Sequence, residues 1–495
     1  MHLPKRITGL LLLFSFSMIV YGQAAKSKSG NAVGAIRETD IKADLFAMAG
    51  DHFRGREAGT LDELKVSVWL ADQARAAGLL PAGDDGTYFQ FFSMWRNRIA
   101  ASTSIVIGDS TFHLWKDVFV TQTAPATVQA PIVFVGKTLQ DIAAADVKGK
   151  VAAIAVSGDD INLNVSLYPR RYAGSITRKY LPALLAKGVV AVIFIADALA
   201  DDSWSHVLPS LTRGLYDIEG GVNAVTTPKP PVIWLHNNAL GFLRQPALVL
   251  HATVNIERFE YPSVNVVGKI KGSDPVLANE YVLFSGHQDH DGVRQPYGND
   301  SIYNGADDNA SVSVALLAIA RAFRQQPGKR SALFVWHGAE ERGLLGSKWF
   351  SATPTVPKSS IVAVLNGDMI GRNNPDSAAL LGMVPPHRNS EELVAMALEA
   401  NKEGPAFKLD TTWDAVRHVE GWYFRSDHLP YARAGIPALF YTTLLHPDYH
   451  TPMDEPGRID TKKLTRMTEW MYRTGWKVAN NAQRPKLVSG FQLER

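Results

Sequence analysis

Imidazole and carboxylate side chains in the C-terminal half of the chain have the types that a two-metal hydrolase needs. They are His287, Asp308, Glu340, Glu341, Asp368 and His450. Nitrogen and oxygen donors without sulfur suit Zn²⁺, Mn²⁺ or Co²⁺, and zinc is the commonest in such hydrolases. If one carboxylate bridges, two histidines and three carboxylates can hold two ions about 3.5 Å apart. The glutamate left over beside a ligand is then free to act as a general base.

Each of these residues has a simpler interpretation when taken alone. A single histidine after a strand is usually a hydrogen-bonded structural residue. The Asp307–Asn309 segment can cap the following helix, Glu340–Arg342 can be a solvated charged turn, and Asp368 can cap a turn. These interpretations do not explain why all of these residues fall at the C-terminal ends of predicted strands. Burying several carboxylates together is costly unless they are paired or bind a metal, so the set favours a metal site.

The elements around these residues predict an α/β fold with a mostly parallel central sheet flanked by helices. Near-continuous apolar runs predict strands, and longer amphipathic segments between them predict helices. The predicted strands are Tyr281–Ser285, Ser331–Trp336, Ile361–Leu365 and Ala438–Thr442, and the predicted helices are Ser311–Arg324, Glu391–Asn401 and Lys462–Asn480. Candidate ligands follow all four strands, and sites in such sheets form beyond the carboxyl ends of the strands.

The first half of the chain has a different pattern. Ile41–Gly78 is predicted to be helical because its apolar residues recur on one helix face. The middle contains the predicted strands Ala130–Val135, Lys150–Val156, Val189–Ile195 and Val232–Leu235, with a short helix at Tyr180–Lys187. This pattern is typical of a small mixed α/β domain of ordinary size.

Composition narrows the class of protein. The chain has 495 residues, a net charge of +3, 46% hydrophobic and 20% charged residues, which is the profile of a soluble globular protein of two or three domains. So small a net charge gives no reason to expect nucleic acid or an anionic membrane as a partner. The absence of cysteine excludes disulfides, thiolate zinc sites and cysteine nucleophiles.

The first 22 residues predict a cleaved signal peptide. Lys5 and Arg6 precede the apolar run Gly9–Val20, and Gly22 lies just beyond it. An uncleaved membrane anchor is the alternative, but a bilayer span needs about 20 residues and this run is shorter. No later segment of the sequence is long and apolar enough to cross a membrane. We therefore expect a secreted or periplasmic protein.

The strings GHQDH, NGADDNAS, GAEERGLLGS, NGDMIG and YHTPMD together resemble the co-catalytic dizinc exopeptidases, metallopeptidase family twenty-eight. The resemblance implies a zinc-exopeptidase (phosphorylase/hydrolase-like) fold and two Zn²⁺ ions per chain. It also implies a discontinuous peptidase domain at 36–115 and 255–485. The region 116–254 is similar to the protease-associated (PA) domain inserted in many such enzymes.

The resemblance also implies a role for each residue. Asp308 would bridge the two zinc ions, His287 and Asp368 would complete one site, and Glu341 and His450 would complete the other. Glu340 would be the general base that deprotonates the water between the ions. Asp289 would orient the imidazole of His287 from behind. Ser426–His428 would be structural or substrate-lining; Ser426 as a nucleophile is the rival interpretation, disfavoured because no oxyanion motif is visible.

The function implied is an exported exopeptidase, foremost an aminopeptidase that acts on peptides. The alternatives are a glutamate-releasing carboxypeptidase, a glutaminyl cyclase-like enzyme and a non-catalytic receptor-like protein. The carboxypeptidase would need an arginine-rich pocket, for which Arg372, Arg417 and Arg425 are available. Trp413 and Trp422–Phe424 could line an apolar side-chain pocket. The sequence predicts neither the side-chain preference nor the oligomeric state.

Overall fold

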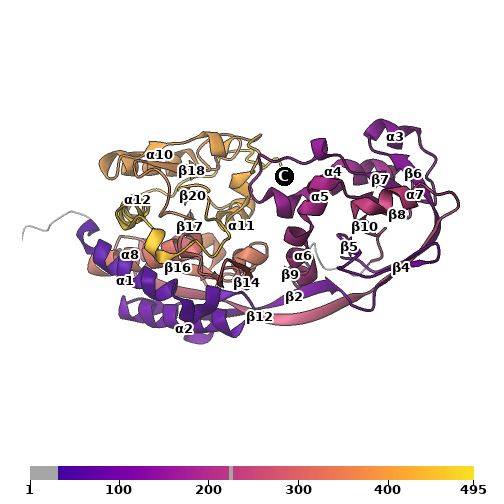
Figure 1. Ribbon diagram of the computed structural model, residues 1–495. Coiled ribbons are helices and arrows are strands. Elements are labelled where there is room, and N and C mark those ends of the chain that lie inside the picture. Colours follow the sequence, from indigo (N-terminus) through magenta and orange to yellow (C-terminus); the bar gives the residue numbers. More distant parts are fainter. Residues whose placement is uncertain (1–31, 222–226) are drawn as a thin grey trace, which may run out of the picture. The chain divides into compact units, whose positions relative to one another are not determined.

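The computed structural model describes residues 32–221 and 227–495 of this chain (Figure 1). The predicted signal peptide at 1–22 lies outside the described residues. Within the described ranges, no helix combines the length and the apolar character needed to cross a bilayer.

A mixed sheet forms the main body, in the strand order β19-β18-β20-β17-β13-β16-β12-β2-β9, with β1 paired to β12. Its strands are β1 (Leu80–Pro81), β2 (Phe89–Ile99), β9 (Leu215–Ile218), β12 (Ile256–Ile270), β13 (Tyr281–His287), β16 (Ser331–His337), β17 (Ile361–Gly367), β18 (Ser377–Leu381), β19 (Lys408–Leu409) and β20 (Ala438–Thr442). The central strands β16, β13, β17 and β20 run parallel to one another. The flanking strands β12, β2 and β18 pair antiparallel, so parallel pairing is confined largely to the centre rather than prevailing throughout.

Helices cover both faces of the main sheet (Figure 1). They are α1 (Glu38–Met48), α2 (Leu61–Ala76), α8 (Ser311–Gln325), α9 (Leu345–Ala352), α10 (Glu391–Glu403), α11 (His428–Arg433) and α12 (Thr461–Asn480). Alternate residues of β13 enter different cores: Phe284 packs with α8 and α12, whereas Leu283 packs with Phe350 of α9. This burial on both sides explains why the central strands are continuous apolar runs.

The predicted helix at Ile41–Gly78 is two helices, α1 and α2, separated by a turn. Arg54 and Gly55 have positive φ in that turn, so the chain cannot continue as one right-handed helix. Thr60 then caps α2 by accepting a hydrogen bond from the backbone N–H of Asp62.

A second sheet lies in the middle of the sequence, in the order β4-β3-β11-β6-β7-β8-β10-β5. Its strands are β3 (Ser104–Ile107), β4 (Ser110–Phe112), β5 (Val118–Val120), β6 (Ala126–Gly136), β7 (Val151–Ala155), β8 (Ala191–Ile195), β10 (Val232–Leu235) and β11 (Val249–Val254). The helices of this region are α3 (Leu139–Ala144), α4 (Tyr168–Ala186), α5 (Ala198–Asp202), α6 (Trp204–Arg213) and α7 (Leu240–Leu243). The four strands predicted here are confirmed, and the short predicted helix is the end of the longer α4.

Contacts at several points join the second-sheet region to the main sheet. After α6 the chain enters β9, which pairs with β2 of the main sheet. Glu420, from the main-sheet region, accepts hydrogen bonds from the backbone and hydroxyl of Ser166 and from Arg171. The hairpin of β14 (Gly292–Tyr297) and β15 (Asp300–Tyr303) follows the end of β13. These contacts place α4, α6 and the hairpin near the carboxyl ends of the central strands.

Candidate metal centre

The four parallel strands deliver the candidate ligands to one edge of the main sheet. His287 is the last residue of β13, and Asp368 directly follows β17. Glu340 and Glu341 open a short turn after β16, and His450 ends the loop that follows β20. Because these strands are parallel, their carboxyl ends lie together, as the sequence predicts.

Asp308 stands at the centre of the cluster. Its Oδ1 lies 3.2 Å from Nε2 of His287, and its Oδ2 lies 3.1 Å from Nε2 of His450. The two oxygens of one carboxylate therefore face two different imidazoles. The neighbouring Asp307 does not share this position, because its Oδ1 accepts a hydrogen bond from the backbone N–H of Gly371 at 2.6 Å.

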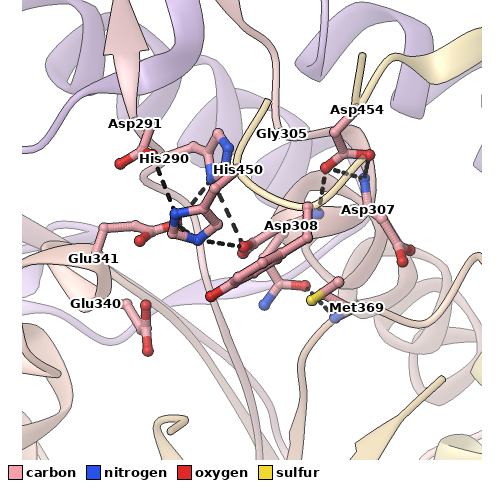
Figure 2. Close-up of polar contacts among 12 residues, drawn as sticks. His290, Asp291, Gly305, Asp307, Asp308, Glu340, Glu341, Met369, His450 and Asp454 are labelled. Atoms are coloured by element: carbon pink, nitrogen blue, oxygen red, sulfur yellow. Dashed lines mark hydrogen bonds and ion pairs between the residues drawn. The ribbon is translucent and has the colours of Figure 1, made fainter. Parts of the chain in front are cut away.

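The donor atoms fall into two groups that share Asp308, each compact enough to surround one ion. One consists of His287, Asp308 and Asp368. The other consists of His290, Asp308, Glu341 and His450, all labelled in Figure 2. In the first group, Nε2 of His287 lies 3.6 Å from Asp368. In the second, Glu341 Oε1 lies 3.2 Å from Nε2 of His450 and 2.9 Å from Nδ1 of His290. All six of these side chains are buried or nearly so.

His290 is a donor that the sequence reasoning missed. It is fully buried, and its Nε2 has no hydrogen-bond partner among the described residues. Its ring meets that of His450 edge to face, with 5.3 Å between centroids. The signal was present in the same HQDHDG string, which carries a second imidazole one residue after Asp289.

Neighbouring groups fix which imidazole nitrogen faces the centre. Nδ1 of His287 lies 3.1 Å from the backbone carbonyl of Asp289. A carbonyl oxygen can only accept a hydrogen bond, so Nδ1 carries the proton, and Nε2 keeps a free lone pair with which it can bind a metal ion. Nδ1 of His450 lies 3.1 Å from Asp291. Asp291, which was not predicted from the sequence, therefore contacts Nδ1 of His450 in the same way as the Asp289 carbonyl contacts Nδ1 of His287.

The carboxylate of Asp289 contacts the Glu340–Glu341 turn more closely than it contacts the His287 ring. Its oxygens accept hydrogen bonds from the backbone N–H groups of Glu340 at 3.0 Å and Glu341 at 3.2 Å, whereas Nδ1 of His287 is 3.8 Å away. Asp454 has a similar place beneath Asp308: its carboxylate accepts from the backbone of Asp307 and Asp308. Through these hydrogen bonds both carboxylates hold in place the loops that carry the candidate ligands.

Glu340 lies at the rim of the cluster rather than within either group. Its carboxylate is 3.9 Å from Nε2 of His287, and Figure 2 shows it apart from the contacts among His290, Glu341 and His450. Burial raises the pKa of Glu340 well above its ordinary value despite the attraction of His287, and the Glu341 and Asp368 carboxylates add to the rise. A carboxyl group with a raised pKa is a better base than an exposed one.

The cluster fits a pair of cations. Nε2 of His287 and Oε1 of Glu341 are buried and make no conventional hydrogen bond among the described residues. Burial acts to raise the pKa of Asp308, yet the adjacent imidazoles of His287 and His450 outweigh it and leave that pKa lowered. Four carboxylates this close together need positive charge beyond that of the histidines. The donors, imidazole nitrogen and carboxylate oxygen without sulfur, are those that suit zinc.

A cavity of about 250 Å³, the metal-site cavity, opens at the cluster. It reaches Asp308, Glu340, Glu341, Asp368 and His450, and its apolar wall consists of Leu344, Met369, Trp422 and Phe424. Arg425 also lines it, paired with Glu420 and Tyr449. Of the aromatic residues considered from the sequence, Tyr423 instead stacks on His387, and Trp413 lines a different cavity.

The Ser426–His428 segment is buried beside the cluster but is not arranged as a nucleophile and base. Ser426 accepts a hydrogen bond from Asn366 at 2.8 Å, and it also hydrogen-bonds Asp368. His428 packs between Tyr423 and Phe440, and neither ring nitrogen has a hydrogen-bond partner among the described residues. The segment therefore supports the wall of the site.

Comparison with known proteins relates part of this chain to one family. Residues 265–474 match the family described as Peptidase family M28. An aminopeptidase of Pseudomonas aeruginosa is 30% identical over 193 residues, which are 38% of this chain and 31% of that protein. Aminopeptidase YwaD of Bacillus subtilis is 24% identical over 247 residues, 48% of this chain and 50% of that protein. The chain thus spans half or less of the length of these curated relatives.

Solved structures share the fold over nearly the whole chain. An aminopeptidase from Aneurinibacillus sp. strain AM-1 superposes with a TM-score of 0.58 at 18% identity, covering 94% of this chain and 98% of that one. The structure of BSAP, a zinc aminopeptidase from Bacillus subtilis, gives a TM-score of 0.55 at 18% identity, with 92% and 99% covered. The likeness extends across both sheets, since it covers most of each chain.

Proposed function

We propose that this chain, whose residues 265–474 match peptidase family M28, is an exported aminopeptidase that uses two zinc ions. The observation that carries the proposal is the position of Asp308, whose two oxygens face His287 and His450 separately. A carboxylate placed in this way can bridge two ions. A glutamate with a raised pKa, Glu340, stands beside it.

The residues assigned to the ions follow from the two groups. His287 and Asp368 would hold one zinc with Asp308, and Glu341 and His450 would hold the other, with His290 as a further donor. When bound, the zinc pair supplies Lewis acidity, which polarises the scissile carbonyl and eases deprotonation of a water molecule.

In this proposal Glu340 acts first as a general base and then as a general acid. Its carboxylate accepts a proton from the attacking water and later donates it to the amine that leaves. The backbone of Glu340 is fixed by Asp289, so the base is held at a constant position relative to the ligand Glu341. Burial and neighbouring carboxylates raise the pKa of Glu340, which favours the first of these transfers, the uptake of the proton.

The metal-site cavity favours the amino end of a substrate. Its lining combines the carboxylate of Glu340, which is not assigned to an ion and can attract a free α-amino group, with Leu344, Met369 and Trp422, which suit an apolar side chain. Such a cavity supports release of single N-terminal residues.

The remaining predicted features belong to the proposal as well. The chain would be exported by the signal at 1–22. Residues 116–254 would be a PA-type inserted domain between the peptidase segments 36–115 and 255–485. The parallel strands β6, β7, β8 and β10 support a separate α/β unit there. Strands β3 and β4 pair with that unit through β11, which supports an insertion that begins before residue 116.

One assay series tests the function. The purified protein is given leucine p-nitroanilide, an N-blocked peptide ending in glutamate, and a peptide with N-terminal glutamine, each with and without a metal chelator. Cleavage of the anilide alone, lost with chelator and restored by zinc, is expected. Cleavage of the blocked peptide would show a carboxypeptidase, and cyclisation of the third a cyclase. No turnover of any substrate by zinc-loaded protein would overturn the proposal.

Metal stoichiometry tests the site itself. Asp308→Asn removes the shared carboxylate charge, so we expect loss of both zinc ions and of activity. Asp307→Asn, at the adjacent residue that faces Gly371 instead, is the matched control and should keep its metal. Retention of two ions by Asp308→Asn would contradict the bridging assignment.

A further inference from the structure

A second cavity adjoins the metal-site cavity at His450. It has a volume of about 330 Å³ and lies between the second-sheet region and the main-sheet region. Its lining includes the start of α4, the end of α6, the β14–β15 hairpin and the loop Thr451–Pro452. Three arginines from three different elements line it: Arg170, Arg213 and Arg294. We call it the arginine pocket.

The arginine pocket carries more positive charge than its surroundings neutralise. Arg342 lies close enough to Arg213 and Arg294 to lower their pKa values, and it is 2.9 Å from Glu57 and 3.8 Å from Asp291. Arg294 shares Asp291 with Arg342, and Arg213 reaches Glu57 only at 4.0 Å. For the guanidinium of Arg170, no ion pair or hydrogen bond occurs within the described residues. Three of these four guanidinium groups thus share two carboxylates, and Arg170 pairs with neither.

These cations repel one another in a partly buried place. Burial first, and then neighbouring Arg342, lower the pKa of Arg213 to about 10, and burial with Arg213 and Arg342 lowers that of Arg294 further. The first turn of α4 also lines the pocket, and the amino end of a helix carries partial positive charge. An anion placed among these groups relieves the repulsion.

We propose that the arginine pocket binds a carboxylate of the substrate on the leaving side of the scissile bond. The inference rests on the proposed aminopeptidase function, which places the amino end of the substrate in the metal-site cavity. The rest of the peptide must then pass His450, and the adjoining cavity is the arginine pocket. Guanidinium groups bind carboxylates through paired, charge-assisted hydrogen bonds, which makes arginine the suitable residue for this task.

Two parts of a peptide can supply that carboxylate. One is the C-terminal carboxylate of a dipeptide; the other is an acidic side chain on the second residue of a longer peptide. A pocket of about 330 Å³ is at the lower end of the size of ligand sites, about 300–1,000 Å³, and takes a single residue. The enzyme would then prefer short or acidic peptides over neutral ones.

Matched substrates separate the two sources. The zinc-loaded enzyme is assayed with Leu-Gly against Leu-Gly-amide, and with Leu-Glu-amide against Leu-Gln-amide. We expect kcat/KM to be at least about tenfold higher for the charged member of one pair. This is the size of effect that one charge-assisted hydrogen bond between an arginine and the substrate carboxylate would give. A preference in the first pair identifies the C-terminal carboxylate, and one in the second identifies the side chain.

Substitution at Arg170 tests the residue assignment. Arg170→Gln should reduce the charged-to-neutral ratio of kcat/KM to near one, and Arg170→Lys should keep part of it because a charge remains. Arg178→Gln, on the exposed side of the same helix α4, is the matched control and should leave the ratio unchanged. Equal melting temperatures of the variants exclude loss of fold as the cause.

The failures of the two proposals are distinct. If leucine p-nitroanilide is cleaved but neither substrate pair shows a preference, the arginine pocket proposal is overturned and the aminopeptidase function stands. If a preference persists unchanged in Arg170→Gln, the assignment to these arginines is wrong. If no substrate is cleaved at all, the function fails first.

Discussion

Nδ1 of His450 lies 3.1 Å from a carboxylate oxygen of Asp291, and this contact leaves Nε2 of the same ring facing Asp308 and Glu341. Asp291 comes from the segment after β13, whereas His450 comes from the loop after β20. The contact therefore ties two loops of the site together. It also sets the orientation in which the ring can bind a cation.

Asp291→Asn is expected to weaken metal binding by about 10–100-fold, which is the usual effect of removing such a partner. The readout is zinc retained during titration with a competing chelator. Asp72→Asn, on an exposed part of α2, serves as the control. Unchanged affinity in Asp291→Asn would mean that the loop alone positions the ring.

Glu340→Gln is expected to lower kcat by about 10²–10⁴-fold, the range for loss of a general acid–base group, while two zinc ions stay bound. The neighbouring Glu341→Gln should instead lose zinc, because Glu341 faces His290 and His450 directly. Elemental analysis beside the rate separates the two roles. Full turnover by Glu340→Gln would remove it as the base.

His290→Asn is expected to loosen metal binding in the group that contains Glu341. His290 is fully buried, and its Nδ1 is 2.9 Å from the Glu341 carboxylate, so its loss removes a donor or frees that carboxylate. The absorption spectrum of Co²⁺-substituted protein distinguishes these cases, because only a lost ligand changes the coordination number. His251→Asn, on an exposed strand position, is the control. Unchanged metal affinity would rule out both roles.

Glu63 predicts a pH dependence of stability away from the metal centre. Burial, reinforced by Asp289, raises the pKa of Glu63 to about 8 in the folded state. The folded protein thus keeps a proton that the unfolded chain releases near its ordinary pKa of 4.5. The associated stability is complete below pH 4.5 and is lost as the pH rises through 8, by about 1.4 kcal/mol per unit at most.

Glu63→Gln should remove this dependence. Relative to the parent protein, the variant becomes more stable as pH increases from 5 to 8, as measured by the free energy of unfolding in urea at several pH values. Glu455→Gln, at an exposed position, provides the comparison. Parallel pH profiles for Glu63→Gln and the parent would show that Glu63 is ionised in the folded state.

Gly475 predicts a packing effect between α12 and the main sheet. A Cβ at this position would overlap Cζ of Phe284 in β13. Gly475→Ala is therefore expected to destabilise the fold by about 1–3 kcal/mol through overpacking, seen as a lower melting temperature. Gly457→Ala has open space around it and should have little effect. Equal melting temperatures for the two variants would mean that α12 can shift at no cost.

Local patterns in the sequence were sufficient for elements that are short or buried on both sides. Ala438–Thr442 and Val232–Leu235 are strands with the predicted bounds, because continuous apolar runs between turns have few alternatives. The break between α1 and α2 was not predicted, since residues at positive φ leave little trace in helical periodicity. Strand direction at the sheet flanks was also beyond local reasoning, because it depends on how distant segments such as β2 and β12 meet.

For the site, the sequence alone determined which residue types stand at the carboxyl ends of the central strands, since each lies at the end of a recognisable apolar strand or in the loop that follows it. It did not determine which groups stand behind those residues or what lies beside them. The hydrogen-bonding role of Asp289, the burial of His290 and the pairing of Asp291 with His450 depend on loops that meet only in the folded chain. The arginine pocket could not be predicted from the sequence for the same reason. Arg170, Arg213 and Arg294 are far apart in sequence, and only tertiary packing brings their charges together.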